Sequence, residues 1–191
     1  MNRADLFAVP GRTLPFRMDS KPIIVLGDLA LHFSPDLSVA PSTGHELPMM
    51  AGLGGTGGLI SAGLSRLGVS VSILANRAND PVGATLEEMC QSLGVDTRYL
   101  FADFDDVPSA SHIFGPAGSD KPDVSYVADS ANLNLKSDDL RWVDWAQFGT
   151  LIVCSNLIAA DPVRTAAIAA INAMRKVGGT VAFLVDESGP Y

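Results

Sequence analysis

Short apolar runs alternate with stretches of helical periodicity along most of the chain. We expect strands at 23–27, 69–75, 98–101, 151–154 and 180–185. Apolar runs of this length are typical of strands that are buried on both faces. The other patterns predict helices at 57–67, 81–93, 137–145 and 161–177. Strands and helices that alternate in this way predict an α/β fold, in which helices flank a central parallel sheet.

The middle of the chain has a different pattern. Residues 109–114 and 123–128 alternate between apolar and polar positions and are separated by a turn that contains Gly and Pro. Such a pattern predicts two antiparallel strands that are exposed on one face. We expect these segments, near 109–128, to form a small lid sheet with the Pro-, Ser- and Gly-rich excursion near 31–50.

Composition narrows the range of partners and locations. The 191-residue chain has a net charge of −8, which argues against nucleic-acid and anionic-membrane surfaces because both require a basic face. No apolar run reaches the length needed to span a bilayer, and residues 1–20 lack the apolar core of a signal peptide. We therefore expect a cytoplasmic protein with a mobile leader at 1–20 and one domain at 21–191. Cys90 and Cys154 are expected to be free, buried thiols.

The most informative local feature is the turn at 52–58, GLGGTGG, which runs directly into a predicted helix. Without Cβ atoms, such a turn lets a ligand approach the backbone, and the N–H groups of the helix start point toward the ligand. The turn would suit a dinucleotide pyrophosphate or a small polar substrate such as a sugar. A dinucleotide site needs a central strand just before the turn, but Pro48 lies there and cannot donate a backbone hydrogen bond to a neighbouring strand. Such a site also needs an acidic residue after the next strand, but Asn76 and Arg77 lie there. Because Arg77 suits a 2′-phosphate, an NAD(P)-binding module remains an alternative.

Several motifs occur in a fixed order from the first strand onward. They are GD at 27–28, GGTG at 54–57, SRLG at 65–68, ANDPVG at 78–83 and LGVDT at 93–97. In this order and spacing, the chain resembles the PfkB family of ribokinase-like carbohydrate kinases over 23–185. The segment SANLNL at 130–135 is similar to the one that leads from that family's lid to its next helix. The resemblance implies a ribokinase-like central parallel sheet flanked by helices, with a small β lid and with the C-terminal part of the domain missing.

The resemblance also implies an ATP-dependent kinase that uses Mg²⁺, transfers a phosphoryl group to a sugar hydroxyl, and forms a homodimer through its lid. Carried over to this chain, the sugar-binding residues are Asp28, His32, Gly54, Gly55, Thr56 and Asn156. A carboxylate at the C-terminal end of a strand is well placed to accept hydrogen bonds from sugar hydroxyls. From the residues alone, Asp28 and Asn156 are equally consistent with turn residues that bond to nearby backbone, and His32 with a structural histidine.

The chain also departs from the family pattern. The asparagine that follows the family's glycines falls on Leu59, and the asparagine–aspartate pair after the first strand falls on Ala30 and His32. The family's catalytic base and nucleotide pocket belong to a Gly-Ala-Gly-Asp motif, which we expect beyond Tyr191. We therefore predict no catalytic residue, nucleotide site or metal site here, and we expect the chain alone to be inactive and to associate through the strand at 180–185. The alternative hypothesis is a non-catalytic module that binds a small molecule or a partner protein.

Overall fold

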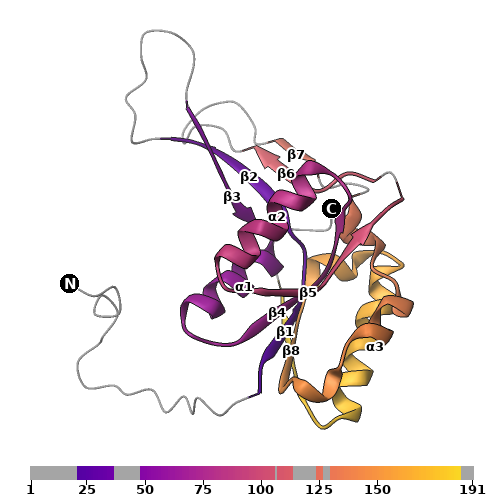
Figure 1. The fold of residues 1–191 in the computed structure, drawn as a ribbon. Helices are drawn as coiled ribbons and strands as arrows, with labels where there is room; N and C mark the ends of the chain where they lie inside the picture. The colour runs from indigo at the N-terminus through magenta and orange to yellow at the C-terminus, as the bar shows by residue number, and fades with distance from the viewer. Residues whose placement is uncertain (1–20, 37–47, 106, 114–123, 127–129, 186–191) are drawn as a thin grey trace, which may run out of the picture.

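Two sheets make up the fold in the computed structural model (Figure 1). The structure describes residues 21–36, 48–105, 107–113, 124–126 and 130–185. The main sheet contains five parallel strands in the order β5-β4-β1-β8-β9. They are β1 (Ile23–Leu26), β4 (Val71–Ala78), β5 (Asp96–Asp103), β8 (Thr150–Cys154) and β9 (Thr180–Leu184). The predicted central parallel sheet is therefore confirmed.

Helices cover both faces of the main sheet. On one face lie α1 (Thr56–Arg66) and α2 (Pro81–Ser92), and on the other face lies α3 (Val163–Lys176) (Figure 1). Leu86 of α2 is buried in the core on the first face, and Ala166 of α3 is buried in the core on the second. The burial of these two apolar layers is the main term that stabilises the fold.

Short 3₁₀ turns connect the elements in the second half of the chain, and η3 and η4 pack beside α3. The turns are η2 (Ala131–Asn134), η3 (Ser137–Trp142), η4 (Trp145–Gln147) and η5 (Ser155–Ala159). The prediction of a continuous helix at 137–145 is wrong, because two separate 3₁₀ turns stand there. Leu140 and Val143 are both buried, and their spacing matches the three-residue period of a 3₁₀ helix. Trp142 and Trp145, the tryptophans of the chain, lie in η3 and η4.

The small sheet contains four short strands in the order β3-β2-β6-β7. They are β2 (Ala30–Pro35), β3 (Met49–Gly54), β6 (Ser111–Ile113) and β7 (Val124–Tyr126). β2 and β3 form an antiparallel hairpin, β6 runs parallel to β2, and β7 pairs antiparallel with β6. The antiparallel pairing expected for the two alternating segments is therefore confirmed over the described residues. The predicted turn at 115–120 lies outside the described residues.

The small sheet lies beyond the C-terminal ends of the main-sheet strands (Figure 1). β1 leads through Gly27, Asp28 and Leu29 into β2, and the N–H of Leu31 donates to the carbonyl of Ala110, just before β6, at 3.0 Å. In an open parallel sheet, ligand sites form in the crevice outside the carboxyl ends of the strands. The junction between the two sheets is therefore the place in this fold that suits a ligand best.

β9 lies at the edge of the main sheet. It pairs with β8 on one side, and no described residue pairs with its other side. Phe183 is 49% exposed and Val185 is 73% exposed. An edge strand with exposed apolar side chains is a favourable surface for pairing with another strand. The association that we expect through this edge stays a prediction.

Asp80 caps the first turn of α2, as its position before Pro81 predicts. Its Oδ1 accepts the N–H of Gly83 at 2.6 Å and the hydroxyl of Ser109 at 2.9 Å, and its Oδ2 accepts the N–H of Ser109 at 3.0 Å. Partial burial acts to raise the pKa of Asp80, but these hydrogen bonds outweigh it, and the pKa lies below its usual value. Because Ser109 shortly precedes β6, this carboxylate fastens α2 to the small sheet.

We expect Asp80→Ala to lower the free energy of unfolding by about 2 kcal/mol, because α2 loses its cap and the buried Ser109 loses its acceptor. Because the pKa of Asp80 is lowered, the stabilisation that its carboxylate contributes is complete above the usual pKa of 3.8. It is lost as the pH falls through the lowered pKa of Asp80. Urea unfolding followed by circular dichroism at neutral pH, and then in steps toward acid, measures both effects.

Asp161→Ala is the matched control for this prediction. At the exposed start of α3, Asp161 accepts the N–H and the hydroxyl of Thr165 and a hydrogen bond from the guanidinium of Arg164. Both partners belong to α3 itself. Its replacement should cost clearly less than that of Asp80, because the carboxylate is exposed to solvent. Equal losses for the two variants would contradict the idea that Asp80 joins α2 to the small sheet.

Candidate functional site

Asp28 follows the C-terminal end of β1 and is only 3% exposed. Its Oδ1 accepts the N–H of Gly57 at 3.3 Å, and its main-chain carbonyl accepts the N–H of Gly58 at 3.0 Å. Both donors belong to the first turn of α1, whose N–H groups have no partner within the helix. A carboxylate at this position is also stabilised by the positive end of the helix dipole. Asp28 therefore lies at the expected strand end, with its carboxylate turned toward the glycine turn.

The glycine turn crosses the end of β1 in backbone-to-backbone contact. A Cβ on Gly57 would lie 2.5 Å from the carbonyl carbon of Gly27, and a Cβ on Gly27 would lie 2.5 Å from the Cα of Gly57. Gly55 caps α1 with a φ of 78°, which residues with a Cβ rarely adopt. The glycines at 55 and 57 are therefore required for packing, independently of any ligand. Thr56, the first residue of α1, is half-buried between them.

His32 lies in β2, and its ring covers Gly54 on the neighbouring strand β3. Its Nε2 accepts the N–H of Gly55 at 3.4 Å, which requires the neutral ring with its proton on Nδ1. His112 of β6 is paired with His32, and the two ring centroids are 4.9 Å apart. Burial lowers the pKa of His32 below 6.5, His112 lowers it further, and the carboxylate of Asp28 opposes this in part. His32 is therefore neutral at pH 7.

The side chain of Asn132, in η2, forms hydrogen bonds with the backbone of Leu29, the residue directly after Asp28. Its side-chain oxygen accepts the N–H of Leu29 at 3.0 Å, and its side-chain amide donates to the carbonyl of Leu29 at 2.8 Å. Asn132 and Leu29 are both buried. The pair of bonds satisfies both backbone groups of Leu29 and thereby fixes the direction in which the preceding residue, Asp28, leaves the end of β1.

Most of the predicted binding residues lie together at the end of β1. This group contains Asp28, His32, Gly54, Gly55 and Thr56. Asn156 lies in η5, which directly follows β8, the neighbour of β1 in the main sheet, and its side chain is outside the described part of the structure. Of the positions that depart from the family pattern, Ala30 is buried and Leu59 is 55% exposed on α1.

Two residues of this cluster, His112 and Asn132, are not among the binding residues predicted from the sequence. The alternation at 109–114 places His112 on one face of a strand but does not reveal that the strand lies beside β2. The segment at 130–135 carried the signal for Asn132, because the family resemblance had marked it. Its two asparagines could not be told apart from the sequence, although Asn132 is buried and Asn134 is only half-buried.

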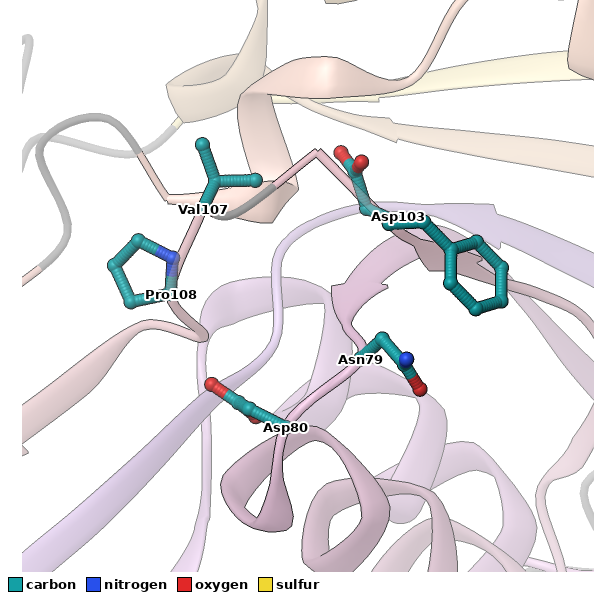
Figure 2. Close-up of a pocket in the computed structure, with 6 residues that line it drawn as sticks. Asn79, Asp80, Asp103, Val107 and Pro108 are labelled. Carbon is teal, nitrogen blue, oxygen red and sulfur yellow. The ribbon is translucent and has the colours of Figure 1, made fainter.

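A separate cavity of about 310 Å³ opens at the C-terminal ends of β4 and β5 (Figure 2). It is lined by Asn79, Asp80, Asp103, Phe104, Val107 and Pro108. Among the described residues, the lining includes two carboxylates and no basic side chain, which makes this part of the cavity unsuitable for an anionic ligand. None of the predicted binding residues whose side chains the structure describes lines it.

The described residues also bear on three other classes of site. β3, which runs into the glycine turn, pairs antiparallel with β2 in the small sheet, whereas a dinucleotide site needs a central parallel strand at that point. Within the ranges that the structure describes, no three His, Cys, Asp or Glu side chains are grouped so that they would hold a metal ion. In the same ranges, no helix has both the length and the apolar character to cross a membrane.

Comparison with curated proteins identifies relatives of about twice the length. No protein-family model matches the chain. The chain is 30% identical over 164 residues to a fructokinase of Escherichia coli, and the match covers 86% of this chain and 50% of the fructokinase. The chain thus spans about half the length of the curated relatives that it matches.

Comparison with solved structures shows the fold. A fructokinase from Xylella fastidiosa with bound ATP gives a TM-score of 0.74 at 17% identity, and the match covers 85% of this chain and 51% of that one. A PfkB protein from Polaromonas sp. JS666 gives a TM-score of 0.71 at 19% identity, covering 86% of this chain and 55% of that one. The predicted ribokinase-like fold is confirmed, as is the resemblance to an N-terminal portion of the PfkB and ribokinase-like sugar kinases.

Proposed function

We propose, starting from the resemblance of this chain to an N-terminal portion of the ribokinase-like sugar kinases, that it is the sugar-binding half of a carbohydrate kinase. In such a kinase, the γ-phosphoryl group of ATP passes to a sugar hydroxyl. Asp28 and the glycine turn at the end of β1 would hold the sugar, and the small sheet would cover it as a lid. The same proposal includes two further points: that two copies make contact through their lids, and that the protein is located in the cytoplasm.

One observation carries the proposal, namely that the buried carboxylate of Asp28 meets the glycine turn at the C-terminal end of β1. A carboxylate accepts strong hydrogen bonds from neutral hydroxyl groups, and glycines allow a sugar ring to approach the backbone. The negative charge of Asp28 disfavours phosphate and carboxylate groups, so a neutral sugar is the better ligand. Phosphoryl transfer depends mainly on positioning and charge stabilisation, and positioning the hydroxyl is the part that these residues would perform.

The cluster at the end of β1 does not fit a nucleotide. The N–H groups at a helix start are natural donors to a phosphate. Here, however, the N–H of Gly55 donates to His32, and those of Gly57 and Gly58 donate to Asp28. The carboxylate of Asp28 would also repel a triphosphate. We therefore assign no contact with ATP or Mg²⁺ to this cluster.

A second candidate function, a non-catalytic module that binds a small molecule, is favoured by two substitutions. Leu59 stands where the family pattern has an asparagine, and its exposed side chain cannot bond to a hydroxyl. His32 stands where the pattern has an aspartate, and its ring is bonded to Gly55. Both substitutions would weaken the positioning of a reacting hydroxyl but would leave Asp28 and the small sheet in place.

We expect titration of D-fructose into the ¹⁵N-labelled chain to shift the backbone amide resonances of residues 54–58. Asp28→Asn should weaken the binding about tenfold, because asparagine keeps an acceptor for Gly57 but loses the charge that strengthens bonds from hydroxyls. Asp138→Asn is the matched control: it removes one charge from the exposed surface of η3 and should leave the affinity unchanged. A panel of other neutral sugars tests the choice of substrate.

The absence of shifts at 54–58 with every sugar of the panel would rule out the sugar-binding proposal. Shifts confined to the lining of the cavity at β4 and β5 would place the ligand elsewhere. ATP consumption by the 191-residue chain should be undetectable with the same panel, and measurable turnover would contradict the assignment of the nucleotide contacts. The two candidate functions differ in one measurement. Sugar-dependent consumption of ATP by a protein that contains this chain together with a nucleotide site would support the kinase over the non-catalytic module.

A further inference from the structure

The glycine turn is already occupied by a side chain of the protein itself. His32 reaches across from β2, its ring covers Gly54, and its Nε2 accepts the N–H of Gly55 at 3.4 Å. The neighbouring N–H group, that of Gly57, donates to Asp28. The polar groups that a ligand would use at this turn are therefore bonded to each other in the structure.

We propose that His32 is an internal occupant of the glycine turn, and that a sugar oxygen reaches the N–H of Gly55 only after the imidazole ring has been displaced. The nature of the ligand in this inference rests on the proposed function, whereas the contact between His32 and Gly55 does not. A hydroxyl or ring oxygen can accept the N–H of Gly55 in place of Nε2. Opening the turn means breaking the hydrogen bond between His32 and Gly55 and moving the ring away. The free energy that this step costs lowers the affinity for any neutral sugar.

Protonation of His32 is a second way to open the turn. The imidazolium carries a proton on both nitrogens and cannot accept the N–H of Gly55. Among the described residues, the titratable groups that act on His32 are His112, on β6, and Asp28, after β1. His112 disfavours the charged ring, whereas Asp28 favours it and would attract it once it is protonated. Because the pKa of His32 is lowered from 6.5, the ring is neutral and bonded to Gly55 at pH 7, and this bond should break as the pH falls through the lowered pKa.

The chemical shift of the Gly55 amide proton measures the contact in the whole chain without any ligand. In the wild type it should move upfield as the pH falls through the lowered pKa of His32, in step with the ring resonances of His32. His32→Ala should give the upfield position at every pH. His112→Phe removes a group that lowers the pKa of His32, so the midpoint of the titration should move to higher pH. A purely structural role of His112 would not move this midpoint.

D-fructose provides the second measurement. His32→Ala should bind it about fivefold more tightly than the wild type at neutral pH, because the ligand no longer has to break a hydrogen bond. His32→Gln is the matched control, since its side-chain oxygen can still accept the N–H of Gly55, and its affinity should stay close to that of the wild type. The wild type should bind more tightly as the pH falls through the lowered pKa of His32.

The outcomes separate this inference from the proposed function. The expected Gly55 shifts together with tighter binding by His32→Ala support both. Weaker binding by His32→Ala would overturn the inference, because His32 would then be a sugar ligand, while sugar binding itself would stand. The expected Gly55 shifts without binding of any sugar would support the occupied turn and contradict the proposed function. A Gly55 resonance that does not follow the titration of His32 in the wild type would overturn the inference even if His32→Ala does not fold.

Discussion

Gly57→Ala is expected to lower the free energy of unfolding by about 3 kcal/mol or more, the largest effect that we predict for a single substitution. The added Cβ would lie 2.5 Å from the carbonyl carbon of Gly27 and 2.9 Å from the backbone nitrogen of Asp28. All of these neighbours are backbone atoms of a buried strand end, so no side chain can rotate to make room. The start of α1 would have to move away from β1, with loss of the hydrogen bonds from Gly57 and Gly58 to Asp28.

Gly63→Ala is the matched control, because it adds the same methyl group in the same helix. A Cβ on Gly63 would meet nothing within 4 Å, and the residue is exposed in the interior of α1. Alanine should therefore stabilise the helix there by about 0.5 to 1 kcal/mol. Urea unfolding followed by circular dichroism measures both variants. Similar effects for Gly57→Ala and Gly63→Ala would show that the contact between α1 and β1 is looser than described.

Asn132→Ala is expected to cost about 3 kcal/mol. Removal of the side chain leaves both the N–H and the carbonyl of Leu29 without their partners in a buried position, and each unsatisfied group costs on the order of 1 to 3 kcal/mol. The segment between β1 and β2 would also lose its attachment to η2. Because Asp28 belongs to this segment, sugar binding should weaken along with stability.

Asn134→Ala, in the same 3₁₀ turn, is the control for Asn132→Ala. Asn134 is half-buried, and replacing it should change the free energy of unfolding by less than about 0.5 kcal/mol. Asn132→Asp adds a sharper test, because an aspartate can accept the N–H of Leu29 but cannot donate to its carbonyl. Its cost should be at least as large as that of Asn132→Ala, because a buried carboxylate oxygen would face the carbonyl oxygen of Leu29. A cost as small as that of Asn134→Ala would contradict the role given to the second bond.

The main sheet and its helices could be predicted because their signals are local. Continuous apolar runs such as 23–27 and 151–154 indicate strands that are covered on both faces, and the structure buries them accordingly. Asp80 before Pro81 indicated the start of α2 for the same kind of reason, since a cap acts within one turn. The position of Asp28 at the end of β1 also followed directly from the apolar run that precedes it.

The contacts that shape the candidate site could not be predicted, because they join distant parts of the chain. Leu29 and Asn132 are 103 positions apart, and His32 meets His112 only through the register between β2 and β6. A shift of this register by one residue would turn one ring to the opposite face of the sheet. The sequence also cannot show whether a polar group bonds to a ligand or to the protein, which is why the contact between His32 and the glycine turn appeared only in the structure.

The placement of the tryptophans determines which spectroscopic signal can follow this protein. The turns η3 and η4, which contain Trp142 and Trp145, lie beside α3. The helix α3 covers the face of the main sheet opposite α1 (Figure 1). Trp142 is 66% exposed with the guanidinium of Arg141 near its ring, whereas Trp145 packs against the core on that face. Intrinsic fluorescence therefore reports how the turns dock on α3, and its emission should remain constant while a ligand fills the site at the end of β1. During heating, the same emission would reveal whether the α3 layer separates before the rest of the domain melts.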